Sequence, residues 1–167
     1  YSARVWLAFS ALGLAACSAG PSSSSKKAVN TMLAAQNYAG AETYLEANKE
    51  SQYGKKNLVL YYLDKGLIQH HGGKFKESDE SFAKAEVRME ELYTKSISQA
   101  AGMLIVNDAT MDYAGEPFER ALTNVFRALN YVFLGQPDEA LVESRKVEAF
   151  LQELNDKYQQ KNVYKDD

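Results

Sequence analysis

The sequence contains a single cysteine, only two histidines and no excess of basic residues. Cys17 cannot form a disulfide within the chain, so no covalent cross-link supports the fold. The adjacent His70 and His71 lack further ligands at the spacing that a zinc site needs. The net charge is −3 at pH 7, with acidic and basic residues interspersed. We therefore expect no nucleic-acid partner, no metal and no other cofactor.

Recognisable catalytic signatures are also lacking. The sequence has no Ser-His-acid or Cys-His arrangement with a local signature and no glycine-rich phosphate loop, so we expect no enzyme. The alternative is an enzyme or enzyme subunit whose active residues lie in an acidic stretch or in a missing C-terminal part. That stretch contains Asp108, Asp112 and Glu116. Its spacing is not that of a calcium loop, and capping of turns and helix ends explains these acids better.

The N-terminal segment carries the most specific signal in the chain. Arg4 precedes an apolar run from Val5 to Leu14, which has the length of a signal-peptide core and is too short to span a bilayer. The run ends in Leu14-Ala15-Ala16-Cys17, the pattern of a bacterial lipoprotein cleavage box. We predict cleavage between Ala16 and Cys17 and lipidation of the Cys17 thiol. The alternative is an ordinary secretory signal cut elsewhere, for instance after Ala19, which would leave a soluble protein.

These features divide the chain into a signal peptide at 1–16, a lipidated cysteine with a flexible Ser/Lys tether at 17–27, and a folded domain at 28–160. Two or more acyl chains on Cys17 would anchor the protein stably to a membrane. We expect a location in the bacterial periplasm or at the cell surface. Ser18 after the cysteine favours the outer membrane if the cell is Gram-negative. Beyond the signal, no apolar run is long enough to cross a bilayer.

The domain is predicted to be all-α. Apolar residues recur at helical spacing from Asn57 to His71 and from Lys74 to about Tyr93, with Gly72-Gly73 ending the first helix. Pro117 suits the first position of a helix that continues to Leu134. Gly135-Gln136-Pro137 then ends that helix and begins another. No segment shows the sustained alternation of a strand.

A spacing recurs three times within these helices. An aromatic residue or proline is followed after three positions by a small residue and after four more by a larger or apolar one. Glycine or alanine at positions 66, 73, 128 and 135 extends the pattern in the second and third copies. The three copies are Tyr38-Ala41-Leu45, Phe75-Ser78-Phe82 and Pro137-Ala140-Ser144.

The pattern resembles the tetratricopeptide repeat, a helix-turn-helix unit of 34 residues. The resemblance implies a short α-solenoid in which small residues let paired helices approach closely. Copy two would span about 59–92 and copy three about 121–154, whereas copy one, about 22–55, departs from the pattern. The 62 residues from Gly73 to Gly135 leave about 28 beyond one repeat. We place this insertion at about 93–120 and interpret it as keeping copies two and three from stacking directly.

The lipoprotein box, the split repeats and two stretches, Gly102 to Asp108 and Tyr113 to Glu119, together resemble a family of poorly characterised bacterial lipoproteins with tetratricopeptide-like repeats. That family implies a location and a fold but no reaction. We also expect the chain to be an N-terminal fragment, because its last charged helical pattern ends without a stop signal. Leu104, Ile105, Val106, Met111 and Tyr113 favour packing of segment 103–113 onto the repeats.

Binding to a protein is the function that these features favour. In repeats of this type the first helix of each pair lines a concave groove, which would be apolar here and would bind an unknown protein. Two alternatives stay open: the chain's own insertion or missing C-terminal part covers the groove, or its apolar residues are ordinary core. By position, the groove residues are Leu60, Leu63, Leu67 and His70 of copy two and Leu122, Val125, Leu129 and Val132 of copy three.

Overall fold

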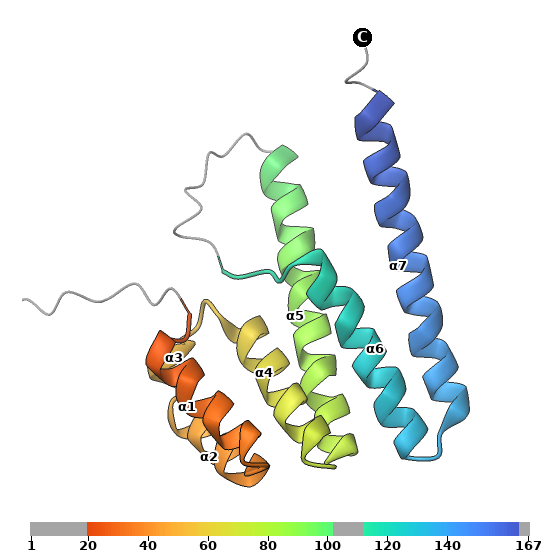
Figure 1. Cartoon of the computed structure of the whole chain (residues 1–167). Helices are drawn as coiled ribbons and strands as arrows, with labels where there is room; N and C mark the ends of the chain where they lie inside the picture. Colours follow the sequence, from red (N-terminus) through yellow and green to blue (C-terminus); the bar gives the residue numbers. More distant parts are fainter. Residues whose placement is uncertain (1–19, 102–111, 164–167) are drawn as a thin grey trace, which may run out of the picture.

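The structure is a computed structural model that describes residues 20–101 and 112–163. Within these ranges the chain forms seven helices and no strand, which confirms the all-α prediction. Figure 1 shows them following one another across the molecule. The helices are α1 (Ser23–Ala34), α2 (Tyr38–Ala47), α3 (Lys49–Gln52), α4 (Leu58–His71), α5 (Phe75–Ala101), α6 (Pro117–Phe133) and α7 (Pro137–Val163).

The helices pack in consecutive pairs, α1 with α2, α4 with α5 and α6 with α7 (Figure 1). Helix α4 and helix α6 lie where the apolar spacing predicts them, and Pro117 is the first residue of α6. Helix α5 continues to Ala101, past the predicted end near Tyr93. The first residues of the predicted insertion, 93–101, therefore belong to α5.

The turn inside each pair has the same geometry. Gly73 and Gly135 adopt φ angles of 74° and 70°, and Gln36 occupies the same place in the first pair with φ 56°. In each turn the residue with positive φ donates its backbone N–H to the carbonyl three residues earlier. The next residue donates to the carbonyl five residues back, at 2.8–2.9 Å. The first pair is therefore built like the others, although a glutamine replaces the glycine that favours this conformation.

Contacts between successive pairs also repeat. The side-chain amide of Gln69 in α4 donates to Glu42 of α2 at 2.7 Å. One repeat later, the Tyr131 hydroxyl of α6 donates to Asp79 of α5 at 3.0 Å. Helices α5 and α6 pack directly against each other, and α4 also contacts α6. The interpretation that the insertion prevents copies two and three from stacking is therefore wrong.

The return of the chain to α6 explains why the extra residues do not disturb this stacking. The backbone N–H of Tyr113 donates to the Lys56 carbonyl at 2.8 Å, and its hydroxyl donates to Glu119 at 2.6 Å. The Tyr113 ring packs against the core between α4 and α5. Tyr113 thus agrees with the predicted packing of segment 103–113, but residues 103–111 lie outside the described residues.

Two apolar clusters form the core. One joins α4 to α5 through Val59, Leu63 and Phe82, and the other joins α2 to α4 through Leu45 and Ile68. Gly66 lets α4 and α5 approach closely, because a Cβ at this position would lie 2.8 Å from the Phe82 ring. The Ser78 hydroxyl of α5 donates to the Gly66 carbonyl at 2.8 Å. The small residues of copy two therefore lie at a close helix contact, as predicted.

Helix α1 begins within the segment predicted as tether. The Ser22 side chain accepts from the Ser25 backbone N–H at 3.2 Å and caps the helix. Ser25 itself is buried. The capping serine and the covered first turn explain why a Ser/Lys-rich sequence is helical here. The predicted cleavage site at Ala16 and Cys17 lies outside the described residues, and no described helix is long and apolar enough to span a bilayer.

Candidate functional site

Helix α6 points its apolar side away from the protein. Phe118, Leu122, Val125, Leu129 and Val132 recur at alternating spacings of four and three residues, which places them along one line of the helix. We call these five residues the α6 seam. Val125 is half-buried, and the other four expose between 40% and 63% of their surface. An exposed apolar stripe of about four turns is unusual for a surface that contacts only water.

The opposite side of α6 is polar and buried. Thr123, Asn124, Arg127 and Asn130 are each at most 8% exposed. Helix α6 is therefore inverted relative to an ordinary amphipathic surface helix, which buries its apolar side. Because polar groups gain little from burial unless they are paired, the contacts on this side must be specific.

Arg127 is at the centre of the buried polar side. Its guanidinium lies 2.8 Å from Asp79 of α5 and 3.2 Å from Glu143 of α7, and it also pairs with Glu86 of α5. Burial lowers the pKa of Arg127, but the hydrogen bond and charge of Asp79 outweigh that effect, so the pKa lies above its usual value. The guanidinium therefore stays charged and ties three helices together.

A second chain of hydrogen bonds joins α6 to α4 and α5. The Asn130 side-chain amide donates to the Ser78 hydroxyl at 2.9 Å. The Asn130 side-chain oxygen lies 2.6 Å from His70 Nδ1. The His70 ring also packs edge-on against Phe126 at 5.0 Å. These contacts fix the rotation of α6 about its axis and thereby hold the seam outward.

Most of the polar groups buried between α6 and its neighbours have hydrogen-bond partners, with two exceptions. Among the described residues, Asn124 Oδ1 and Glu143 Oε2 are buried side-chain atoms without a hydrogen-bond partner. Glu143 nonetheless accepts from Lys146 at 3.1 Å through its other oxygen. The polar contacts around α6 thus combine strong ion pairs with two uncompensated oxygens, one on α6 and one on α7, which lowers the net stability that they supply.

The predicted groove residues fall into two sets. Those of α6, Leu122, Val125, Leu129 and Val132, belong to the exposed seam. Those of α4, Leu60, Leu63, Leu67 and His70, are buried or half-buried. Leu60 and Leu67 face a cavity of about 380 Å³ that is also lined by Val29 and Leu33 of α1. Leu60 and Leu67 therefore face α1 across this cavity, whereas Leu63 lies in the core with α5 and His70 contacts α6.

The acidic stretch has structural contacts where it is described. Asp112 accepts from Arg88 of α5 at 2.7 Å, and Glu116 precedes α6 and exchanges capping contacts with Glu119. Asp108 lies outside the described residues. The described part of the chain contains no cluster of three or more His, Cys, Asp or Glu side chains that could hold a metal ion.

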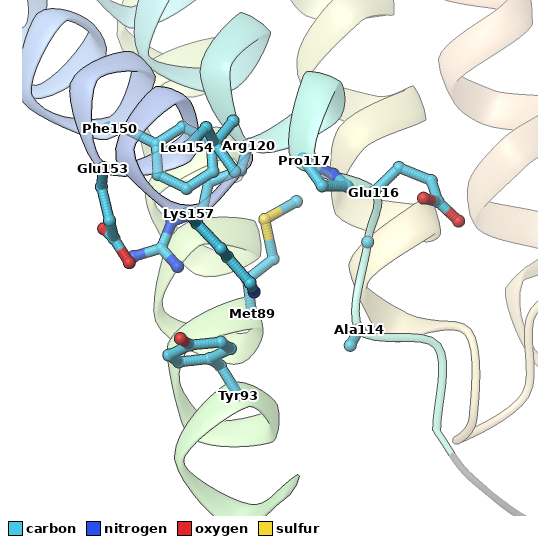
Figure 2. A pocket seen from close by; sticks show the side chains of 11 residues that line it. Met89, Tyr93, Ala114, Glu116, Pro117, Arg120, Phe150, Glu153, Leu154 and Lys157 are labelled. Atoms are coloured by element: carbon cyan, nitrogen blue, oxygen red, sulfur yellow. The ribbon is translucent and has the colours of Figure 1, made fainter. Parts of the chain in front are cut away.

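A small cavity lies where α5, α6 and α7 meet. Its volume is about 150 Å³, and Figure 2 shows side chains from all three helices around it. The Arg120 guanidinium lies 5.9 Å from the centre of the Tyr93 ring and 5.0 Å from that of Phe150. Arg120 also pairs with Glu90 at 2.7 Å. The cavity is smaller than a typical ligand pocket, and its central charge already has an acidic partner.

The buried ion pairs of α6 are not anticipated from the sequence, although the predicted groove already includes Leu122, Val125, Leu129 and Val132 of the seam. One signal was available, because charged and amide residues of α6 fall on one side of the helix and apolar residues on the other. That periodicity identifies two faces but does not say which one is buried. The chain matches no family model, and comparison with curated proteins and with solved structures found no match.

Proposed function

We propose that this chain is a lipid-anchored protein with tetratricopeptide-like repeats, which presents a protein-binding surface at a bacterial membrane. The observation that carries the proposal is the exposed α6 seam, held outward by buried ion pairs on the opposite side of the helix. Exposed apolar stripes of this kind bind the apolar side of another helix or peptide. The repeated turns and inter-pair contacts favour an α-solenoid, a fold that commonly serves as a binding scaffold.

The anchor is the second part of the proposal and depends on the cleavage box at Leu14 to Cys17. Lipidation of Cys17 would confine the seam to the membrane surface and raise its effective concentration toward partners there. The periplasm or cell surface, with the outer membrane if the cell is Gram-negative, is the location that this anchor favours.

Two measurements on the full chain in its native host test the two parts separately. A clickable fatty acid should label the wild-type protein and leave Cys17→Ser unlabelled, and a wild-type protein without label would contradict the anchor. A photo-crosslinking amino acid at Val132 should form adducts with protein, whereas the same group at Lys76, an exposed residue of α5, should not. Equal crosslinking at both positions, or none at Val132, would contradict the binding surface.

A further inference from the structure

The equivalent surface of the preceding repeat is covered within the chain. Because Gly73 and Gly135 occupy the same turn position, Leu60, Leu63 and Leu67 of α4 correspond to Leu122, Val125 and Leu129 of α6. On α4 these positions are buried or half-buried: Leu63 packs in the core with α5, and Leu60 and Leu67 line a cavity together with Val29 and Leu33 of α1. On α6 the corresponding leucines are 47% and 40% exposed. The α6 seam is therefore the exposed counterpart of a surface that is covered on α4.

We propose that the helix covering the α6 seam belongs to a second copy of this chain, so that two α6–α7 pairs associate across a two-fold axis. This inference rests on the proposed function, since it names the partner of the same surface. The α6 seam has a four–three spacing, and two helices of a coiled coil pack together through apolar residues at this same spacing. Two helical hairpins that each expose such a seam can complete a four-helix bundle.

The charge distribution on α6 favours a copy of itself. All five seam residues are apolar, so two identical seams can meet without placing like charges against each other. The charged residues of α6 point elsewhere: Glu119 bonds to Tyr113, Arg120 pairs with Glu90, and Arg127 lies in the buried ion cluster. A closed dimer also requires one patch that is complementary to itself, which a uniform apolar seam provides.

Helix α7 has a stripe of the same spacing, whose first residue is buried and whose later residues include exposed apolar side chains. Ala140, Ser144, Val147, Leu151, Leu154 and Tyr158 repeat the four–three spacing. Leu151 is 51% exposed and Tyr158 is 56% exposed. On the other side of α7, Lys146 pairs with Glu86 of α5, so the exposed pair lies away from that helix. Figure 1 shows α7 continuing beyond the start of α6, which leaves its last turns available to a second hairpin.

The exposed area is sufficient for a stable dimer. Phe133, at the same end of α6, adds a side chain that is 59% exposed. With roughly 100 Å² exposed on each large apolar residue of α6 and α7, the surface reaches about 700 Å² per chain. That is what each partner contributes to a standard protein–protein interface, and it exceeds what most lattice contacts bury.

The test uses two differently tagged full-length copies expressed together, each with a photo-crosslinking amino acid at Val132. We expect an adduct that carries both tags. Leu122→Glu with Leu129→Glu in both copies should reduce that adduct about tenfold or more, because like charges in an apolar interface cost more than the 1.4 kcal/mol behind a factor of ten. Lys76→Glu in both copies is the matched control and should leave the adduct unchanged.

Charge rescue distinguishes a broken interface from a broken fold. One copy carries Leu122→Glu with Leu129→Glu, and the other carries Leu122→Lys with Leu129→Lys. We expect the mixed pair to recover the two-tag adduct, whereas neither variant forms it with itself, a pattern that misfolded chains would not produce. Adducts at Val132 with a different protein would overturn the dimer and leave the proposed function standing. Adducts with lipid only, or none, would overturn both.

Discussion

Helices α4 and α6 occupy equivalent places in successive pairs and bury opposite kinds of side chain. Ile68 of α4 is 2% exposed within an apolar cluster, whereas the corresponding Asn130 of α6 is 0% exposed within a hydrogen-bonded network. Leu63 lies in the core, but the corresponding Val125 lies on the seam. The repeat therefore determines where a helix packs, and the individual sequence determines which of its sides faces inward.

The difference has a physical origin in what each helix contacts. Helix α4 lies between two pairs, so apolar residues on both of its sides are covered. Helix α6 meets acidic residues on its inner side, Asp79 and Glu86 of α5 and Glu143 of α7. A cation and amides satisfy that side, while Phe126 packs on the core between α4 and α5 and the seam residues face outward. Specific polar pairing thus supplements a smaller apolar contact at the last junction.

The largest expected effect comes from removing the charge that satisfies these acids. Arg127→Met should lower the free energy of unfolding by about 3–5 kcal/mol, because Asp79 would lose its cation and the buried Glu143 would keep only the more exposed Lys146. Arg145→Met, at an exposed position of α7, is the control and should change stability by less than about 0.5 kcal/mol. Urea unfolding followed by circular dichroism measures both. Equal effects would show that the ion cluster does not hold α6.

Truncation at corresponding positions compares the two helices directly. Leu63→Ala removes a buried side chain between α4 and α5 and should cost about 2–4 kcal/mol. Val125→Ala on the seam should cost less than about 1 kcal/mol in dilute protein, since the side chain is half-buried. If a second copy covers the seam, the cost of Val125→Ala rises with protein concentration, which thermal melts over a dilution series would detect. A large, concentration-independent cost would place Val125 in the core of a single chain.

Exchanges in the repeated turn should have smaller effects. Gln36→Gly relieves a left-handed conformation of a non-glycine residue and should stabilise the first pair by up to about 1 kcal/mol. Gly73→Gln imposes the same strain on the second pair and should cost about 1–2 kcal/mol. Thermal denaturation measures both variants. A higher melting temperature for Gln36→Gly and a lower one for Gly73→Gln would support equivalent turns, whereas a lower melting temperature in both would contradict that equivalence.

The sequence alone predicted the helix pairs, because spacing and turn residues such as Gly73 and Pro117 act locally. It did not predict the direct stacking of copies two and three. The number of residues between two repeats gives the length of an insertion. The contact between α5 and α6 depends instead on where the two ends of that insertion lie, and Tyr113 returns the chain to the core. The burial of Arg127 could not be predicted from the sequence either, because its acidic partners come from two other helices.

The smallest expected effect concerns the first junction and its dependence on pH. The hydrogen bond from Lys65 lowers the pKa of the Glu46 carboxyl, and Tyr61 donates to the same group at 2.8 Å. A carboxyl whose folded pKa is lowered adds stability above its unfolded pKa, about 4.3, and loses it as pH falls through the folded value. Glu46→Gln should remove this acid dependence and cost less than about 1 kcal/mol at pH 7, because the Glu46 side chain is 45% exposed. Glu50→Gln on α3 is the control. Unfolding measured between pH 7 and pH 3 should separate the two variants, and parallel curves would show that the Glu46 contacts do not stabilise the junction between α2 and α4.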